Sequence, residues 1–276
     1  ANFAAQIALA PDQTLPPALD IEVAEGKSAA QLEQWIEEFT SELKRLTGRT
    51  PMIYTYKYFW MGQMNNSQKF SDMPLWLAAY QDQAPEAVGG WKELSFWQRS
   101  GSGKVAGIST DVDMNLFNGS KQQLQSFSDG NYVDVGGALE QLVVSDGLDL
   151  SSDSTPLIGA ILALAAGLIA IPQLADAAEK SGLDPQAAEG LAGFVKTLKD
   201  KDALPVEDLG DMAKGNFSVS DLAILLDNAG HVNNVKSGNV SESEVSEAKN
   251  AAKNAGADVP DFDAAQVATL LNRVLQ

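Results

Sequence analysis

Strand-like and helix-like segments alternate along the first 117 residues of this chain of 276 residues. Residues 15–23 have the pattern of a buried strand, and residues 28–47 have the pattern of a helix with one apolar face. A capping box of Ser28 and Gln31 begins this helix, and Gly48 follows its end. Further strands are expected at residues 51–58, 74–80, 94–98 and 111–117. This alternation predicts a mostly parallel sheet whose functional groups lie at the carboxyl ends of its strands.

The composition of the chain changes near residue 126, where a segment rich in turn-forming residues begins. All five Trp and four of the five Tyr precede residue 127. Residues 1–126 hold 14 acidic and 10 basic residues, a net charge of −4, whereas residues 127–276 hold 23 and 9, a net charge of −14. Ser218 with Asp221 and Ser241 with Glu244 have the pattern of helix starts in the second part. We therefore predict an α/β domain at 1–126 and a separate all-α domain at 127–276.

An apolar run in the second part, residues 157–171, starts at Leu157 and ends at Ile171. No charged residue occurs between Asp153 and Asp176. A membrane span needs about 20 apolar residues, and this run is shorter, is bounded by prolines and lacks flanking Lys or Arg. We expect it to form the central buried helix of the all-α domain without membrane contact. A membrane-inserting helix, as in a membrane-active toxin, is the alternative.

The composition also excludes several kinds of chemistry. The chain has no Cys and a single His, His231, in a segment with the pattern of a polar turn. These counts exclude disulfides, thiol nucleophiles and Cys/His zinc sites, and we expect neither a metal site nor a cofactor. A formal net charge of −18 disfavours nucleic acid as a partner. Asp and Glu are therefore the residues expected to carry proton chemistry.

Asp20 and Glu22 are the most informative local feature of the first part. In a strand, residues two apart face the same way, so both carboxylates project from one side near the strand's carboxyl end. Like charges held close raise one pKa, which keeps one carboxyl protonated as an acid. The alternative is that the pair only ends a strand or caps the next helix. Asp113 lies in another strand-like segment, and its alternative is a surface acid.

Aromatic residues lie on the same predicted strands as these acids. Such rings near carboxylates suit a platform for sugar rings, and packing in the core of an α/β protein is the alternative. They are Tyr54, Tyr56, Tyr58, Trp76, Tyr80 and Trp97.

Several motifs together resemble the glycoside hydrolase family 25 lysozymes, in the family's order and over roughly residues 1–126. The motifs are Leu15 to Glu22 (LPPALDIE), a Trp-bearing helix, Thr47 to Thr55 (TGRTPMIYT), Pro74 to Tyr80 (PLWLAAY), Phe96 to Gln98 (FWQ), and Gly107 to Phe117 with Val112, Asp113, Met114 and Asn115.

The resemblance implies a TIM-like β/α barrel that cleaves the β-1,4 bond between N-acetylmuramic acid and N-acetylglucosamine in bacterial peptidoglycan. It implies that Glu22 is the general acid, that Asp20 is its carboxylate partner, and that Asp113 positions or stabilises the charged transition state. An oxocarbenium-like transition state needs such a proton donor and nearby negative charge. Direct attack by the second group and attack by the substrate's own N-acetyl group stay open. The substrate-binding residues implied by the matching motifs are Tyr54, Trp76, Tyr80, Trp97 and Gln98.

The chain also departs from the family's pattern. The resemblance implies an earlier strand with a further catalytic Asp, followed by two or more βα units, yet only 14 residues precede Leu15. We interpret the first part as an incomplete barrel and expect the chain to be a fragment or a processed product of a longer muramidase. No signal peptide is visible, and delivery to the bacterial cell wall by secretion or with a phage is expected. The alternative function is a non-enzymatic wall-binding or structural protein. The all-α domain is expected to bind a protein partner.

Overall fold

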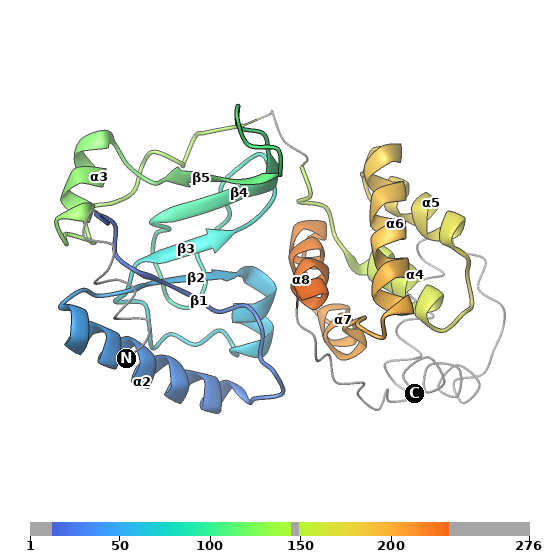
Figure 1. Ribbon diagram of the computed structural model, residues 1–276, viewed down its shortest axis with the longest axis horizontal. Coiled ribbons are helices and arrows are strands. Elements are labelled where there is room, and N and C mark those ends of the chain that lie inside the picture. Colours follow the sequence, from blue (N-terminus) through green and yellow to red (C-terminus); the bar gives the residue numbers. More distant parts are fainter. Residues whose placement is uncertain (1–12, 145–148, 232–276) are drawn as a thin grey trace. The chain divides into compact units, whose positions relative to one another are not determined.

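The computed structural model describes residues 13–144 and 149–231, and the chain divides into two compact units between Asp149 and Leu150 (Figure 1). The first unit is α/β and the described part of the second is helical. The elements of the first unit are β1 (Ala18–Asp20), α2 (Ala29–Thr47), β2 (Met52–Tyr56), the π-helix η1 (Phe59–Gln63), β3 (Leu75–Ala78), β4 (Phe96–Gly103), β5 (Val112–Phe117) and α3 (Lys121–Ser128).

The five strands form one sheet in the order β1-β2-β3-β4-β5. The first four strands are parallel, and β5 returns antiparallel to β4. The predicted mostly parallel sheet is therefore confirmed. Each of its strands overlaps a predicted segment, although β4 extends to Gly103, past the predicted end at Gln98. Because the four parallel strands end on the same side, residues that follow them meet at one edge of the sheet. The incomplete barrel stays a prediction, and β1 and β5 are the outer strands among the described residues.

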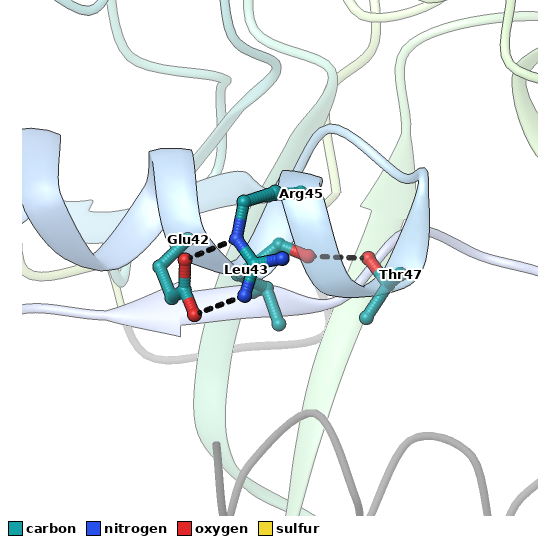
Figure 2. A network of polar contacts seen from close by, with 4 residues as sticks. All are labelled: Glu42, Leu43, Arg45 and Thr47. Carbon is teal, nitrogen blue, oxygen red and sulfur yellow. Dashed lines mark hydrogen bonds and ion pairs between the residues drawn. The ribbon is translucent and has the colours of Figure 1, made fainter.

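Helix α2 connects β1 to β2 and runs alongside the sheet (Figure 1). The Ser28 side chain accepts from Gln31 N while the Gln31 side chain accepts from Ser28 N, and Gly48 ends the helix with a φ of 71°. Near this end Arg45 contacts both carboxylate oxygens of Glu42 at 2.7 Å, and the Thr47 hydroxyl donates to Leu43 O at 2.7 Å (Figure 2). The ion pair is exposed, so its contribution to stability is small. Burial of apolar residues such as Leu43 holds the helix in place.

One face of the sheet changes from apolar to polar along its strands. At the amino ends of the parallel strands, Met52 and Phe96 form a buried cluster with Phe127 of α3. Partly buried side chains pack against this cluster, namely Leu15, Ala18, Trp76, Phe117, Leu124, Tyr132 and Val135. Asp20 and Tyr54 lie on the same face, two residues further along β1 and β2. Helix α3 therefore covers the apolar end of this face, and the polar end carries the predicted catalytic residues.

Helix α3 also bears on the predicted domain boundary at residue 126. That position lies inside α3, and Phe127, one residue later, has no exposed surface. The segment that follows joins the same unit, because Gln83 forms a bridge with Val143. The first compact unit accordingly extends to Asp149, and the turn-forming residues after 126 end a helix instead of linking two domains.

The second unit contains α4 (Thr155–Ala165), α5 (Ile171–Lys180), α6 (Pro185–Asp200), α7 (Val206–Met212) and α8 (Val219–His231). The predicted helix start at Ser218 is confirmed for α8, since Asp221 accepts from Ser218 N and the Ser218 hydroxyl accepts from Asp221 N. His231, expected in a polar turn, is the last residue of α8. The predicted start at Ser241 lies outside the described residues.

The apolar run 157–171 is buried as predicted from Leu157 to Ala166, but it is not a single helix, and Gly167 and Ala170 are exposed. Helix α4 ends at Ala165, and Gly167 follows with a φ of 73°. This left-handed backbone conformation, which glycine adopts readily, interrupts the helix. Ile171 then begins α5. Within residues 13–144 and 149–231, no helix is both long enough and apolar enough to cross a membrane.

Candidate active site

The register of the sheet sets Asp20, Tyr54 and Trp76 side by side. Asp20 pairs with Tyr54 across β1 and β2, and Tyr54 pairs with Trp76 across β2 and β3. Side chains at paired positions project from the same face of a sheet. Two residues further along, Ala78 pairs with Gln98, and Gln98 pairs with Asn115 of β5. We call this polar end of the sheet face, with Asp20, Tyr54, Trp76, Gln98 and Asn115, the acidic edge.

Asp20 and Glu22 are joined by a side-chain hydrogen bond. The pKa of Asp20 is raised because neighbouring protein atoms surround its carboxyl group, although the residue as a whole keeps contact with solvent. The hydrogen bond to Glu22 lowers the pKa of Asp20, as expected when Glu22 donates to the Asp20 carboxylate. The Oε2 atom of Glu22 is shielded from solvent. Two carboxyl groups joined in this way hold one proton between them, which is the arrangement an acid catalyst needs.

Tyr54 lies at the centre of the acidic edge. Its hydroxyl donates to Gln98 Oε1 at 2.7 Å. Burial raises the pKa of Tyr54, and the charges of Glu22, Asp20 and Asp113 and the Tyr80 hydroxyl raise it further. The hydroxyl is therefore neutral near pH 7. All three predicted catalytic acids therefore act electrostatically on Tyr54.

Asp113 reaches this edge from β5, beside Gly101 of β4. A Cβ at Gly101 would lie 3.0 Å from the Tyr80 hydroxyl and 3.7 Å from Asp113 Oδ1. Tyr80 and Asp113 thus converge over a position that has no side chain. Asp111, two residues earlier on the chain, forms an exposed ion pair with Lys104 and takes no part in this convergence.

Trp76 is half-buried and is held by two contacts. Its ring meets the Tyr54 ring edge to face, with centroids 4.9 Å apart and planes at 71°. Its indole N–H donates to Asn115 Oδ1 at 2.9 Å. Sequence reasoning did not select Asn115, although its position two residues after Asp113 in a strand indicates the same face.

The structure brings together seven of the eight predicted site residues and separates Trp97 from them. Trp97 has no exposed surface, and its indole N–H donates to Ala79 O at 2.7 Å. It pairs with Leu77 and belongs to the core on the opposite face of the sheet. Gln98 is only 3% exposed, and its side-chain oxygen is occupied by Tyr54. Of the predicted substrate-binding residues, Tyr54, Trp76 and Tyr80 therefore keep partial exposure at the acidic edge.

A cavity of about 410 Å³ lies elsewhere in the first unit, between residues 83–94 and 118–140. It contains none of the predicted site residues. The buried amide of Asn118 on its wall already bonds to Leu94 O and Leu139 N. Among the described residues, no three carboxylate or imidazole groups are arranged to hold a metal ion.

Comparison with known proteins identifies relatives of the first unit. Residues 1–108 match the sequence model of the family described as glycosyl hydrolases family 25. Lysozyme M1 of Streptomyces globisporus is 38% identical over 122 residues, with 41% of this chain and 41% of that protein covered. An N,O-diacetylmuramidase of Chalaropsis sp is 34% identical over 125 residues, with 42% of this chain and 57% of that protein covered.

A solved structure is also similar in sequence. The bacterial lysozyme from Streptomyces coelicolor is 31% identical, with 46% of this chain and 65% of that chain covered and a TM-score of 0.41. The chain spans about two fifths of the length of the first curated relatives that it matches, lysozyme M1 and the Escherichia coli protein YegX.

Proposed function

Residues 1–108 of the chain belong to glycosyl hydrolase family 25, and on this basis we propose that the protein is a peptidoglycan hydrolase. It cleaves the β-1,4 bond between N-acetylmuramic acid and N-acetylglucosamine. Its sheet is the second part of a β/α barrel, and its site of action is the bacterial cell wall. Similarity to a lysozyme and to N,O-diacetylmuramidases supports this activity.

The hydrogen-bonded pair of Asp20 and Glu22 is the observation that carries the proposal. Glycoside hydrolysis needs one carboxyl group that is protonated and one that is negatively charged. A pair that shares one proton supplies both, and desolvation of the Asp20 carboxyl group disfavours loss of that proton.

Each group at the acidic edge then has a role. Glu22 donates its proton to the oxygen of the leaving sugar, and the Asp20 carboxylate stabilises the positive charge that develops near the anomeric carbon. Asp113 adds negative charge from the opposite side of Tyr54. The exposed parts of Trp76 and Tyr80 offer apolar ring surface to a sugar.

Clearing of purified peptidoglycan by the full chain tests this proposal. The variant Glu22→Gln removes the acid and keeps the shape, and Glu25→Gln is a matched control three residues later at an exposed position. Loss of a general acid lowers the rate by about 100-fold to 10,000-fold. We expect this loss for Glu22→Gln and near-normal clearing for Glu25→Gln. Equal clearing by all three proteins would reject Glu22 as the acid, and binding to peptidoglycan without turnover would favour a wall-binding function.

The helical unit is proposed to bind a protein partner. Its described helices bury their apolar residues within the unit. Residues 150–276 hold 18 acidic and 9 basic residues, a net charge of −9. Co-precipitation of a partner by residues 150–276 attached to the first unit, but not by the first unit alone, would support this role.

A further inference from the structure

Gln98 lies at the acidic edge but is almost without contact with solvent, with 3% of its surface exposed. It is on β4, whereas the hydroxyl that it binds belongs to Tyr54 of β2. The intervening strand, β3, has the small residue Ala78 at the position that pairs with Gln98. The Tyr54 hydroxyl reaches past this strand and forms a part-buried hydrogen bond of 2.7 Å with Gln98.

This bond determines where the only proton of the Tyr54 hydroxyl points. Four other groups act on the same hydroxyl electrostatically: Glu22 and Asp20 from the end of β1, Tyr80 from the segment after β3, and Asp113 from β5. Asp20 is also paired with Tyr54 across β1 and β2. Three of them are carboxyl groups that would accept the proton. A hydroxyl that donates to a carboxylate stabilises the charged form and lowers its proton affinity.

We propose that Gln98 is a positioning residue: it holds the Tyr54 proton away from the Asp20 and Glu22 pair, so that the pair keeps the proton needed by the leaving sugar. The catalytic consequence depends on the proposed function, whereas the effect on the pair does not. Tyr54 is left with its oxygen lone pairs facing the other groups, so it accepts hydrogen bonds from a ligand instead of competing for the shared proton.

Removal of the Gln98 oxygen has a specific consequence for the pair. Without that oxygen, the part-buried Tyr54 hydroxyl must find another partner, since buried polar groups in proteins are nearly always hydrogen-bonded. Among the carboxyl groups, Glu22 has the largest electrostatic effect on this hydroxyl, and Asp20 pairs with Tyr54 across β1 and β2. Donation to either of these two groups makes the pair release its proton at lower pH.

Carbon-13 NMR titration of the Asp and Glu carboxyl groups in the full chain, without substrate, tests the proposal. The proteins compared are the unmodified chain, Gln98→Met, Tyr54→Phe and the double variant. Methionine keeps the length and volume of glutamine but has no strong acceptor. Circular dichroism identifies any variant that is not folded.

We expect Gln98→Met to lower the proton affinity of the Asp20 and Glu22 pair about tenfold, a fall of about one unit in the apparent pKa of the pair. The double variant returns to the unmodified titration, because a phenylalanine ring has no hydroxyl proton to donate. Tyr54→Phe alone leaves the titration unchanged, because Gln98 already holds that proton. A merely structural role for Gln98 predicts lower stability but no movement of the carboxyl titration.

Two results would overturn the proposal. One is an unchanged titration in a folded Gln98→Met protein. The other is a rise in the pair's pKa in Tyr54→Phe, which would show that Tyr54 already donates to the carboxylates; this second test holds even if Gln98→Met does not fold. Failure of the proposed function is seen separately, as peptidoglycan clearing that does not depend on Glu22.

Discussion

Replacing Phe127 with alanine is expected to destabilise the first unit strongly. The side chain has no exposed surface, and its ring contacts those of Phe96 and Phe117, with centroids 5.5 Å away in each case, and Tyr132, at 4.9 Å. A buried Phe→Ala change costs about 3–5 kcal/mol. Each aromatic contact contributes about 1 kcal/mol, and this contribution is already included in the cost of the Phe→Ala change. We predict a loss of about 4 kcal/mol in the free energy of unfolding.

Urea unfolding followed by tryptophan fluorescence measures this loss selectively. All five Trp lie at or before residue 97, so the signal reports on the first unit only. Gln122→Ala is the matched control, because it is exposed on the same helix and should change stability by less than about 0.5 kcal/mol. Leu174→Ala removes a buried side chain of the second unit, and it should leave the fluorescence transition in place.

A loss below about 1 kcal/mol for Phe127→Ala would refute the reasoning, because it would show that the ring is not part of this core. The same result would return the domain boundary to residue 126. A chain that ends at residue 126 offers a second comparison, since it lacks the ring altogether, and we expect it to unfold at lower urea than a chain that ends at residue 149.

Three further changes test other parts of the structure. Gly101→Ala adds a methyl group 3.0 Å from the Tyr80 hydroxyl and beside Asp113; we expect a roughly tenfold rise in KM for soluble peptidoglycan fragments, and an unchanged KM would place the substrate elsewhere. Thr55→Val removes a buried hydroxyl that has no hydrogen-bond partner among the described residues, so a gain of about 1–2 kcal/mol in urea unfolding is expected, and a loss would indicate a hidden partner. Desolvation of its carboxyl group raises the pKa of Asp20 above the ordinary value of 3.8. Protonated Asp20 therefore adds to the stability of the folded state in full below about pH 3.8, and this contribution is lost as the pH rises through the pKa in the folded state. Asp20→Asn should therefore stabilise the first unit near pH 7 but not at about pH 3, and an equal effect at both pH values would contradict the raised pKa.

The sequence predicts the elements of the first unit well, because each carries a local signal. Ser28 and Gln31 form the capping box that the pattern indicates, and Gly48 takes the left-handed conformation expected after a helix. The pairing of Asp20 with Glu22 also follows from strand geometry, in which residues two apart share a face. Local rules of this kind need no knowledge of distant residues.

Other features depend on contacts that are distant in the sequence. Trp97 and Gln98 are neighbours in a strand whose two faces are both covered, so periodicity does not show which one faces the site. Phe127 lies in a segment rich in turn formers, and only its contact with Phe96 reveals it as core. The apolar run is interrupted at Gly167 by a left-handed backbone conformation, and the composition of the run does not indicate this interruption.

The identity of the reducing ends released from purified peptidoglycan tests the central claim most directly. Mass spectrometry of the products after reduction distinguishes N-acetylmuramic acid from N-acetylglucosamine at the new chain end. The account predicts new ends on N-acetylmuramic acid from the full chain, at a rate that falls at least about 100-fold in Glu22→Gln. New ends on N-acetylglucosamine, or the same ends at an equal rate from Glu22→Gln, would contradict it.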